Sequence, residues 1–154
     1  MEVSYELLID IDSCEYLYLR EISEPADNEL RLLIEEAGTR LESSSLDLKV
    51  TGVEFSNLSP IESSDESRLF EVTWETYIAY SVRNESFAKI DPYEEHEGTR
   101  ACLYSKSRFL DYVANATFAS EDYPGPFRHI GINCLNHIID VISTSVPTIR
   151  DLRR

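Results

Sequence analysis

Glycine is scarce in this chain, and its five copies lie far apart. No glycine-rich loop is present to place backbone N–H groups around a phosphate. The chain also lacks the G-x-S-x-G turn that exposes the nucleophile of α/β-hydrolases. These absences argue against the common nucleotide-binding enzymes and against a serine hydrolase.

Histidine is rarer still, with three copies. His96, His129 and His137 show neither the H-x-H nor the H-E-x-x-H spacing of metal ligands. The acidic segment 91–98, D-P-Y-E-E-H-E-G, lacks the regular ligand spacing and the central glycine of a calcium loop. We therefore predict no metal site and no cofactor.

The cysteines form no C-x-x-C motif, and their odd number predicts buried free thiols. They are Cys14, Cys102 and Cys134. A catalytic cysteine needs a histidine beside it and a group that orients this histidine. Cys134 and His137 would share a face only on a helix. Cys102 would meet His129 only if their strands paired, so no catalytic residue is predicted.

Positive charge is in short supply. The 154 residues contain 14 Lys and Arg against 29 Asp and Glu, which gives a formal net charge of −15. Such a surface repels nucleic acid and anionic membranes and favours a basic protein partner. No run of about 18 apolar residues is present to span a membrane. The N-terminus carries acids where a signal peptide carries bases, so we expect a cytoplasmic protein.

The most regular stretch of the sequence is 69–83. Phe70, Val72 and Trp74 alternate with polar residues, and the alternation continues to Val82. A period of two in aromatic and β-branched residues predicts a long strand with one buried face. We expect the sheet to be built around this strand. Further strands are predicted at 3–11, 16–22, 46–55 and 100–104.

Two helices are predicted, at about 24–42 and 106–117. The first follows Ser23 as a cap and Pro25 in its first turn, with apolar residues at helical spacing from Ala26 to Leu41. The second follows Ser105 or Ser107 as its cap. The apolar run 135–143 fits either a strand with a break near Asn136 or a helix, since short apolar runs fit both periods. The basic tail 147–154 is expected to be loose.

These elements predict a single α+β domain over 1–154. Two helices are too few to cover both faces of a parallel sheet. A mainly antiparallel, twisted sheet with both helices on one face is therefore expected.

The candidate binding residues are acids and a tyrosine in two places. On the polar face of the long strand, Glu71, Glu75 and Tyr77 recur at a period of two. In the acidic segment that follows they are Asp91, Glu94, Glu95 and Glu97. We interpret both groups as contacts for a basic partner.

The leading hypothesis is a binding protein, not an enzyme. We expect an acidic immunity-type inhibitor that neutralises a basic bacterial toxin by occluding its active site. The alternative is a small-molecule enzyme or ligand-binding domain, with a cleft on the sheet that uses Tyr77, Arg83, His129 and His137. A third hypothesis is a structural subunit or adaptor, which would form a stable homodimer.

Overall fold

The chain folds into mainly antiparallel sheets with two α-helices. The computed structural model describes residues 2–39, 48–50, 53–55, 61–64 and 66–154. Helix α1 spans Glu2–Asp12, α2 spans Arg108–Ala116, and a 3-10 turn η1 spans Glu85–Phe87. No helix among these described residues is long and apolar enough to cross a membrane.

The described strands form two five-stranded sheets and a separate hairpin. Sheet I has the order β1 (Tyr16–Ser23), β2 (Leu30–Thr39), β6 (Leu69–Trp74), β12 (Thr148–Asp151), with β5 (Ile61–Glu62) on the end of β2. Sheet II has the order β7 (Ala79–Asn84), β11 (His137–Ser143), β10 (Arg128–Asn133), β9 (Ala101–Lys106), β8 (Glu95–Glu97). The hairpin joins β3 (Leu48–Val50) to β4 (Val53–Phe55).

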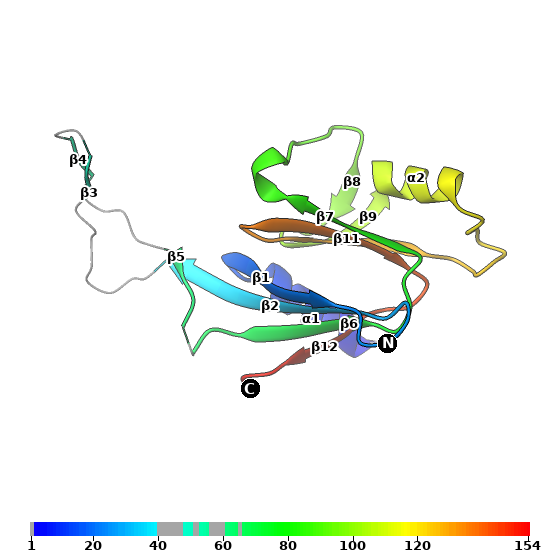
Figure 1. The fold of residues 1–154 in the computed structure, drawn as a ribbon, viewed down its shortest axis with the longest axis horizontal. Coiled ribbons are helices and arrows are strands. Elements are labelled where there is room, and N and C mark those ends of the chain that lie inside the picture. The colour runs from blue at the N-terminus through cyan, green and yellow to red at the C-terminus, as the bar shows by residue number, and fades with distance from the viewer. Residues whose placement is uncertain (1, 40–47, 51–52, 56–60, 65) are drawn as a thin grey trace.

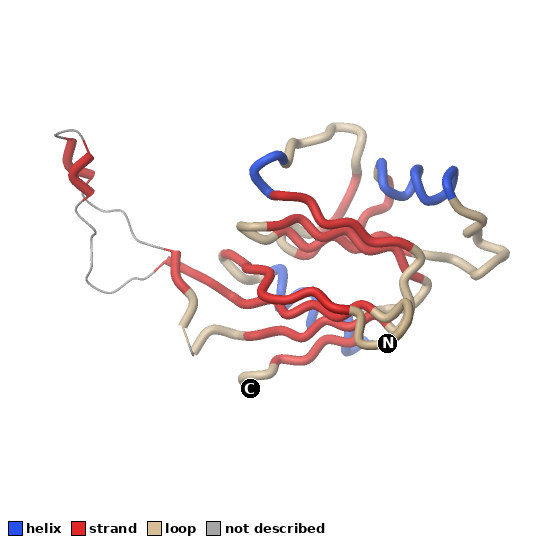
Figure 2. The backbone as a smooth tube through the Cα atoms, viewed as in Figure 1, coloured by secondary structure: helices blue, strands red, loops and turns tan. Residues whose placement is uncertain are grey.

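The hydrophobic core lies between the two sheets, which are stacked as layers in Figures 1 and 2. Phe70, Val72 and Trp74 of sheet I are almost completely buried, as are Ile132 and Ile139 of sheet II. Burial of each such side chain contributes about 1.5–3 kcal/mol. Helix α1 lies beside β12 and β9, and α2 covers the outer side of sheet II (Figure 1).

The predicted strand 69–83 is two strands in two different sheets. Strand β6 belongs to sheet I and β7 to sheet II, and residues 75–78 carry the chain across. The crossing is fixed at its far end, where Ile78 N–H donates to Ile142 O at 2.8 Å. The alternation continues through the crossing, which is why the sequence pattern showed no break. The prediction of a single sheet around this stretch is therefore wrong.

The predicted strand at 3–11 is helix α1. Ile11 is completely buried, and Leu7 and Leu8 pack against the same core. These positions share a helical face, whereas Ile9, which strand alternation would bury, is 67% exposed. Leu8, the one break in the alternation, was the indication of a helix.

The predicted helix 24–42 is also wrong. Its residues form a turn and then β2, the central strand that pairs with both β1 and β6. Leu30, Leu32 and Ile34 are completely buried at a period of two. The same run also fits a helical period, but it forms a strand because a neighbouring strand pairs with it on each side. Residues 40–42 of the predicted helix lie outside the described residues.

The second predicted helix is confirmed, and the choice left open at 135–143 is decided. The helix predicted at 106–117 is α2, and Ser107 is its cap, because its side chain accepts from Leu110 N–H at 3.0 Å. The run 135–143 is a strand with the break at Asn136, not a helix. The Asn136 side-chain amide bonds both backbone groups of Leu19 at 3.0 Å, which ties sheet II to sheet I.

The tail 147–154 is not loose. Strand β12 pairs with β6, and Ile149 is buried in the core. Arg150 donates to Glu71, and Arg153 donates to Glu35 at 2.8 Å. An apolar anchor and two half-buried acids thus order the basic tail.

Candidate functional site

A chain of buried polar side chains lies on the outer face of sheet II, beneath α2. Ser107 Oγ is 2.7 Å from His129 Nδ1, and His129 Nε2 is 2.7 Å from Asp140 Oδ1. Arg83 Nη2 donates to the other Asp140 oxygen at 3.0 Å. Ser107, His129 and Asp140 are at most 3% exposed, whereas the Arg83 side chain is 50% exposed. The chain therefore runs from the buried cap of α2 to an exposed guanidinium.

The hydrogen-bond pattern assigns the proton positions in this chain. Ser107 Oγ already accepts from Leu110 N–H, so its own proton is available to His129 Nδ1. The imidazole then donates its Nε2 proton to Asp140. Both carboxylate oxygens of Asp140 are occupied, one by His129 and one by Arg83.

Aromatic contacts fix the His129 ring. Tyr104 of β9 stacks on it with ring centroids 4.0 Å apart, and Phe109 of α2 meets it edge-on at 5.6 Å. Gly131 makes room for this arrangement, because a Cβ there would lie 2.9 Å from Tyr104 Cε2. A larger residue at this position would displace the tyrosine ring.

A cleft of about 340 Å³ opens above the Arg83 end of the chain. Its floor is sheet II, with Arg83, His129 and Asp140. One wall is the first part of α2, and the other is the connection 85–94 between β7 and β8. The side chains that reach it from the walls are Lys89, Asp91, Glu94, Arg108, Phe109 and Tyr112.

This arrangement offers side chains held in fixed positions by hydrogen bonds, and the described residues that form it include no activated nucleophile. Ser107 is completely buried and serves as a helix cap. The cysteines are buried and free, as predicted. Burial raises the pKa of Cys134 to about 12 and that of Cys102 to about 11, so neither thiol is ionised near neutral pH. Strands β9 and β10 do pair, yet His129 is engaged with Ser107 and Asp140 instead of Cys102.

The alternative site is assembled only in part. Arg83 and His129 lie together in the cleft. Tyr77 is in the crossing segment between the sheets, where its hydroxyl donates to Glu24. His137 shares by alternation the core-facing side of β11 with Ile139, away from Asp140.

The predicted acidic segment is divided between internal and external roles. Asp91 accepts from Tyr93 N–H at 3.0 Å and from Arg108 Nε at 3.1 Å, and Glu94 accepts from Arg108 N–H at 3.1 Å. The Tyr93 ring lies between the cations of Lys106 and Arg108, at 4.3 and 3.9 Å. Asp91 and Glu94 thus fasten the segment to the start of α2.

Glu95 and Glu97 face outward. They belong to β8, the edge strand of sheet II, and all three residues of β8 are exposed. Neither glutamate forms an ion pair with a described residue. The connection that leads into β8 also presents Phe87, 84% exposed, and Ile90, 97% exposed. We call Phe87, Ile90, Glu95 and Glu97 the β8 surface.

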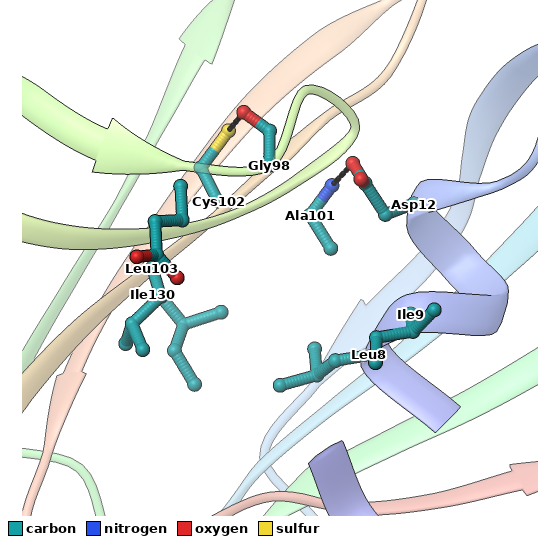
Figure 3. Close-up of a pocket in the computed structure, with 9 residues that line it drawn as sticks. Leu8, Ile9, Asp12, Gly98, Ala101, Cys102, Leu103 and Ile130 are labelled. Atoms are coloured by element: carbon teal, nitrogen blue, oxygen red, sulfur yellow. Dashed lines mark hydrogen bonds between the residues drawn. The ribbon is translucent and has the colours of Figure 1, made fainter. Parts of the chain in front are cut away.

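An apolar pocket of about 290 Å³ lies next to β8, between α1 and sheet II. Figure 3 shows Leu8 and Ile9 of α1 on one side and Leu103 and Ile130 on the other. Glu97 also lines this pocket. The pocket is therefore mainly apolar, and of its two carboxylates, Asp12 and Glu97, the second forms no ion pair with a described residue.

Asp12 holds the α1 side of this pocket in place. Its Oδ1 accepts from the backbone N–H groups of Thr99, Arg100 and Ala101 at 2.6–3.1 Å; Figure 3 shows the last of these. Burial raises the pKa of Asp12, but the three N–H donors and Arg100 outweigh it, and the pKa lies below its usual value.

The remaining predicted contacts are far from the β8 surface in the fold, because they belong to sheet I or to the crossing segment. Glu71 accepts from Arg31 and Arg150 across three strands of sheet I. These two arginines lower the pKa of the Glu71 carboxyl. Glu75 is exposed and has no ion pair with a described residue. The seven predicted residues therefore do not form one patch.

Sequence analysis missed Asp140 altogether. It is the one charged residue in the apolar run 138–142 of a central strand. An acid in such a run must be paired when it is buried. This rule could have identified Asp140, which lies at the centre of the hydrogen-bond network, from the sequence.

No family model, curated protein or solved structure matches this chain. The proposals that follow therefore depend on geometry and charge alone.

Proposed function

We propose that this chain is an immunity-type inhibitor, an acidic binding protein that neutralises a basic bacterial toxin in the cytoplasm. It would bind through the β8 surface and block the toxin's active-site groove. The toxin is expected to be a nuclease-like domain, whose groove carries Lys and Arg to hold an anionic substrate.

The exposed, unpaired carboxylates on the edge strand β8 are the observation that carries this proposal. Most described arginines are consumed by internal ion pairs with half-buried acids, as Glu35 and Glu71 illustrate. With 29 acids against 14 bases, many acids must lie outside such ion pairs. Glu95 and Glu97 are two such acids beside an open strand edge, where a partner strand can also pair.

Exposed apolar groups in the connection that leads into β8 would supply binding energy that charge alone does not. Phe87 and Ile90 are almost fully exposed, and the apolar pocket lies beside Glu97. Protein interfaces combine a few buried aromatic or aliphatic anchors with a polar rim. A basic partner would insert an aliphatic stem into the pocket and place its cation at Glu97.

Steering would follow from the same charges. A surface of one sign raises the rate at which an oppositely charged partner is captured, and salt screens this effect. The carboxylates that occlude the groove would then mimic the phosphates of the toxin's substrate.

The direct test is protection of growth. The product of the adjacent gene is expressed with this chain, and growth is compared with expression of the product alone. Rescue by the wild type, and its loss in the variant Phe87→Ser/Ile90→Ser, are expected. The matched control is Phe118→Ser, which removes a side chain that is 99% exposed in the connection after α2.

Three outcomes contradict the proposal: the adjacent product is harmless when expressed alone, the wild type fails to rescue growth, or all variants rescue it equally. In the last case the chain would protect through a surface other than the β8 surface.

A further inference from the structure

We propose that the cleft on sheet II binds a small aromatic molecule that carries an oxyanion, a carboxylate or a phosphate. This site is separate from the β8 surface, and the inference does not depend on the proposed function. It rests on the donors that the cleft leaves unused, on the fixed orientation of Arg83, and on an aromatic wall.

The cleft has a surplus of hydrogen-bond donors. Arg83 uses Nη2 for Asp140, and Arg108 uses Nε for Asp91, which leaves most donors of both guanidinium groups without an acceptor among the described residues. Lys89 also lines the cleft and forms no ion pair with a described residue. A ligand that accepts hydrogen bonds and carries negative charge matches this set.

Each acid in the cleft already accepts hydrogen bonds. Both oxygens of Asp140 are taken by His129 and Arg83. Both oxygens of Asp91 are taken by Tyr93 N–H and Arg108, and Glu94 accepts from Arg108 N–H at 3.1 Å. The cations that line the cleft are balanced by these carboxylates, so a ligand would be recognised by the donors that these bonds leave unused and not by a surplus of positive charge.

The Arg83 guanidinium is held in a fixed orientation, as is typical of a ligand-binding group. Asp140 fixes one edge of its guanidinium, His129 fixes Asp140, and Ser107 fixes His129. A planar guanidinium that is oriented before the ligand arrives loses little freedom on binding, and it matches the two oxygens of a carboxylate or phosphate. Asp140 and His129 act here as positioning residues.

The wall formed by α2 supplies aromatic side chains that would contact the ring of the ligand. The Phe109 and Tyr112 rings are nearly parallel, with centroids 6.2 Å apart, and both line the cleft. Tyr112 is 61% exposed, so its ring is available to a ligand. A volume of about 340 Å³ is at the lower end of the range found for small-molecule sites, which suits a ligand with one ring.

The test is a calorimetric titration of the full chain with phenyl phosphate and with benzoate. Inorganic phosphate and benzylamine are the comparison ligands, one without the ring and one with the opposite charge. We expect saturable binding of at least one aryl oxyanion, weaker binding of inorganic phosphate, and no binding of benzylamine. Amide shifts in NMR spectra should be confined to the outer face of sheet II and α2.

Arg83→Gln should weaken the binding by about tenfold or more, since it removes a charge-assisted, bidentate contact. Arg83→Lys keeps the charge but loses the planar fork, and it should also bind more weakly. Arg150→Gln is the matched control, because it removes an arginine that pairs with an acid on sheet I. Circular dichroism establishes that each variant is folded.

Positioning by Asp140 has a separate readout. Asp140→Asn keeps the shape but removes the charge that orients Arg83, so the affinity for phenyl phosphate should fall, and Arg83→Gln should cause little further loss in the double variant. A purely structural role would change stability and leave the affinity unchanged, or would add to the loss in Arg83→Gln.

Several results overturn the proposal. They are the absence of saturable binding by both aryl oxyanions, binding of benzylamine with equal affinity, inorganic phosphate binding as tightly as phenyl phosphate, or affinity that Arg83→Gln leaves unchanged.

Discussion

The outer face of sheet I and the β8 edge of sheet II both carry acids, but in different states. On sheet I, Glu35 accepts from Arg20 and Arg153 at 2.8 Å, and Glu71 accepts from Arg31 and Arg150. On β8, Glu95 and Glu97 are exposed and have no ion pair with a described residue. The first set stabilises the sheet across its strands, whereas the second is free to meet a partner.

This difference shows why the number of acids alone does not locate a binding surface. An acid paired with two arginines has little charge left to display, and its removal leaves cations without partners. An exposed acid without a partner contributes little to stability. The comparison predicts that substitutions in the two regions affect different measurements.

The largest effect on stability is expected at the buried network. Asp140→Ala leaves the buried His129 Nε2–H without an acceptor and removes the partner of Arg83. We expect a loss of about 3 kcal/mol in the free energy of unfolding, measured by urea denaturation. Glu95→Ala is the control and should change it by less than about 0.5 kcal/mol. Equal, small losses for both would show that the network is not important to the fold.

Asp12→Ala is expected to cost about 2 kcal/mol, because three backbone N–H groups lose their acceptor. Asp10→Ala, an exposed acid in the last turn of the same helix, should cost less than about 0.5 kcal/mol. The pKa of Asp12 is lowered in the fold, so its contribution is present above the unfolded value of about 3.9 and is lost as the pH falls through the folded value. Asp12→Asn should remove this part of the acid sensitivity.

Glu71→Gln should cost about 1 kcal/mol near neutral pH, because two exposed or partly exposed arginines lose a charged partner. Arg150 and Arg31 lower the pKa of the Glu71 carboxyl. Its contribution is therefore present above the unfolded value of about 4.3 and is lost as the pH falls through the lower, folded value. Unfolding measured across this range should show a smaller pH dependence in Glu71→Gln than in the wild type. Glu75→Gln, which has no such pair, should leave the pH dependence unchanged.

The smallest effect on stability is expected at β8. The double variant Glu95→Gln/Glu97→Gln should unfold within about 0.5 kcal/mol of the wild type, because both side chains are exposed and unpaired. Thermal unfolding measures this difference. A larger loss of stability would mean that these acids stabilise the edge strand itself and are not available to bind a partner.

Local patterns predicted some of the elements, and tertiary pairing decided the others. The α2 helix followed from a cap and a helical period, whereas the run 135–143 fitted a strand or a helix and its pairing makes it β11. The run Leu30–Ile34 fits two periods, and only its place between β1 and β6 makes it a strand. The crossing at 75–78 keeps its alternation, so no local signal separates the two sheets.

The candidate site was less predictable for the same reason. Arg83, Ser107, His129 and Asp140 come from β7, the cap of α2, β10 and β11, and the fold of sheet II with α2 brings them together. Asp91 and Glu94 were predicted as partner contacts, but their place beside Arg108 gives them an internal role. Which charges pair with one another depends on the fold, and the amino-acid composition does not specify this.

The central claim is that the unpaired acids of β8 meet a basic protein. Its most direct test is the association rate constant with the purified product of the adjacent gene, measured by stopped flow at low and high salt. We predict that Glu95→Gln/Glu97→Gln lowers the low-salt rate by about tenfold and weakens its salt dependence. Glu121→Gln/Asp122→Asn, which removes equal charge from an exposed connection after α2, should have a smaller effect. Equal effects of the two double variants, or a rate that does not respond to salt, would contradict the claim.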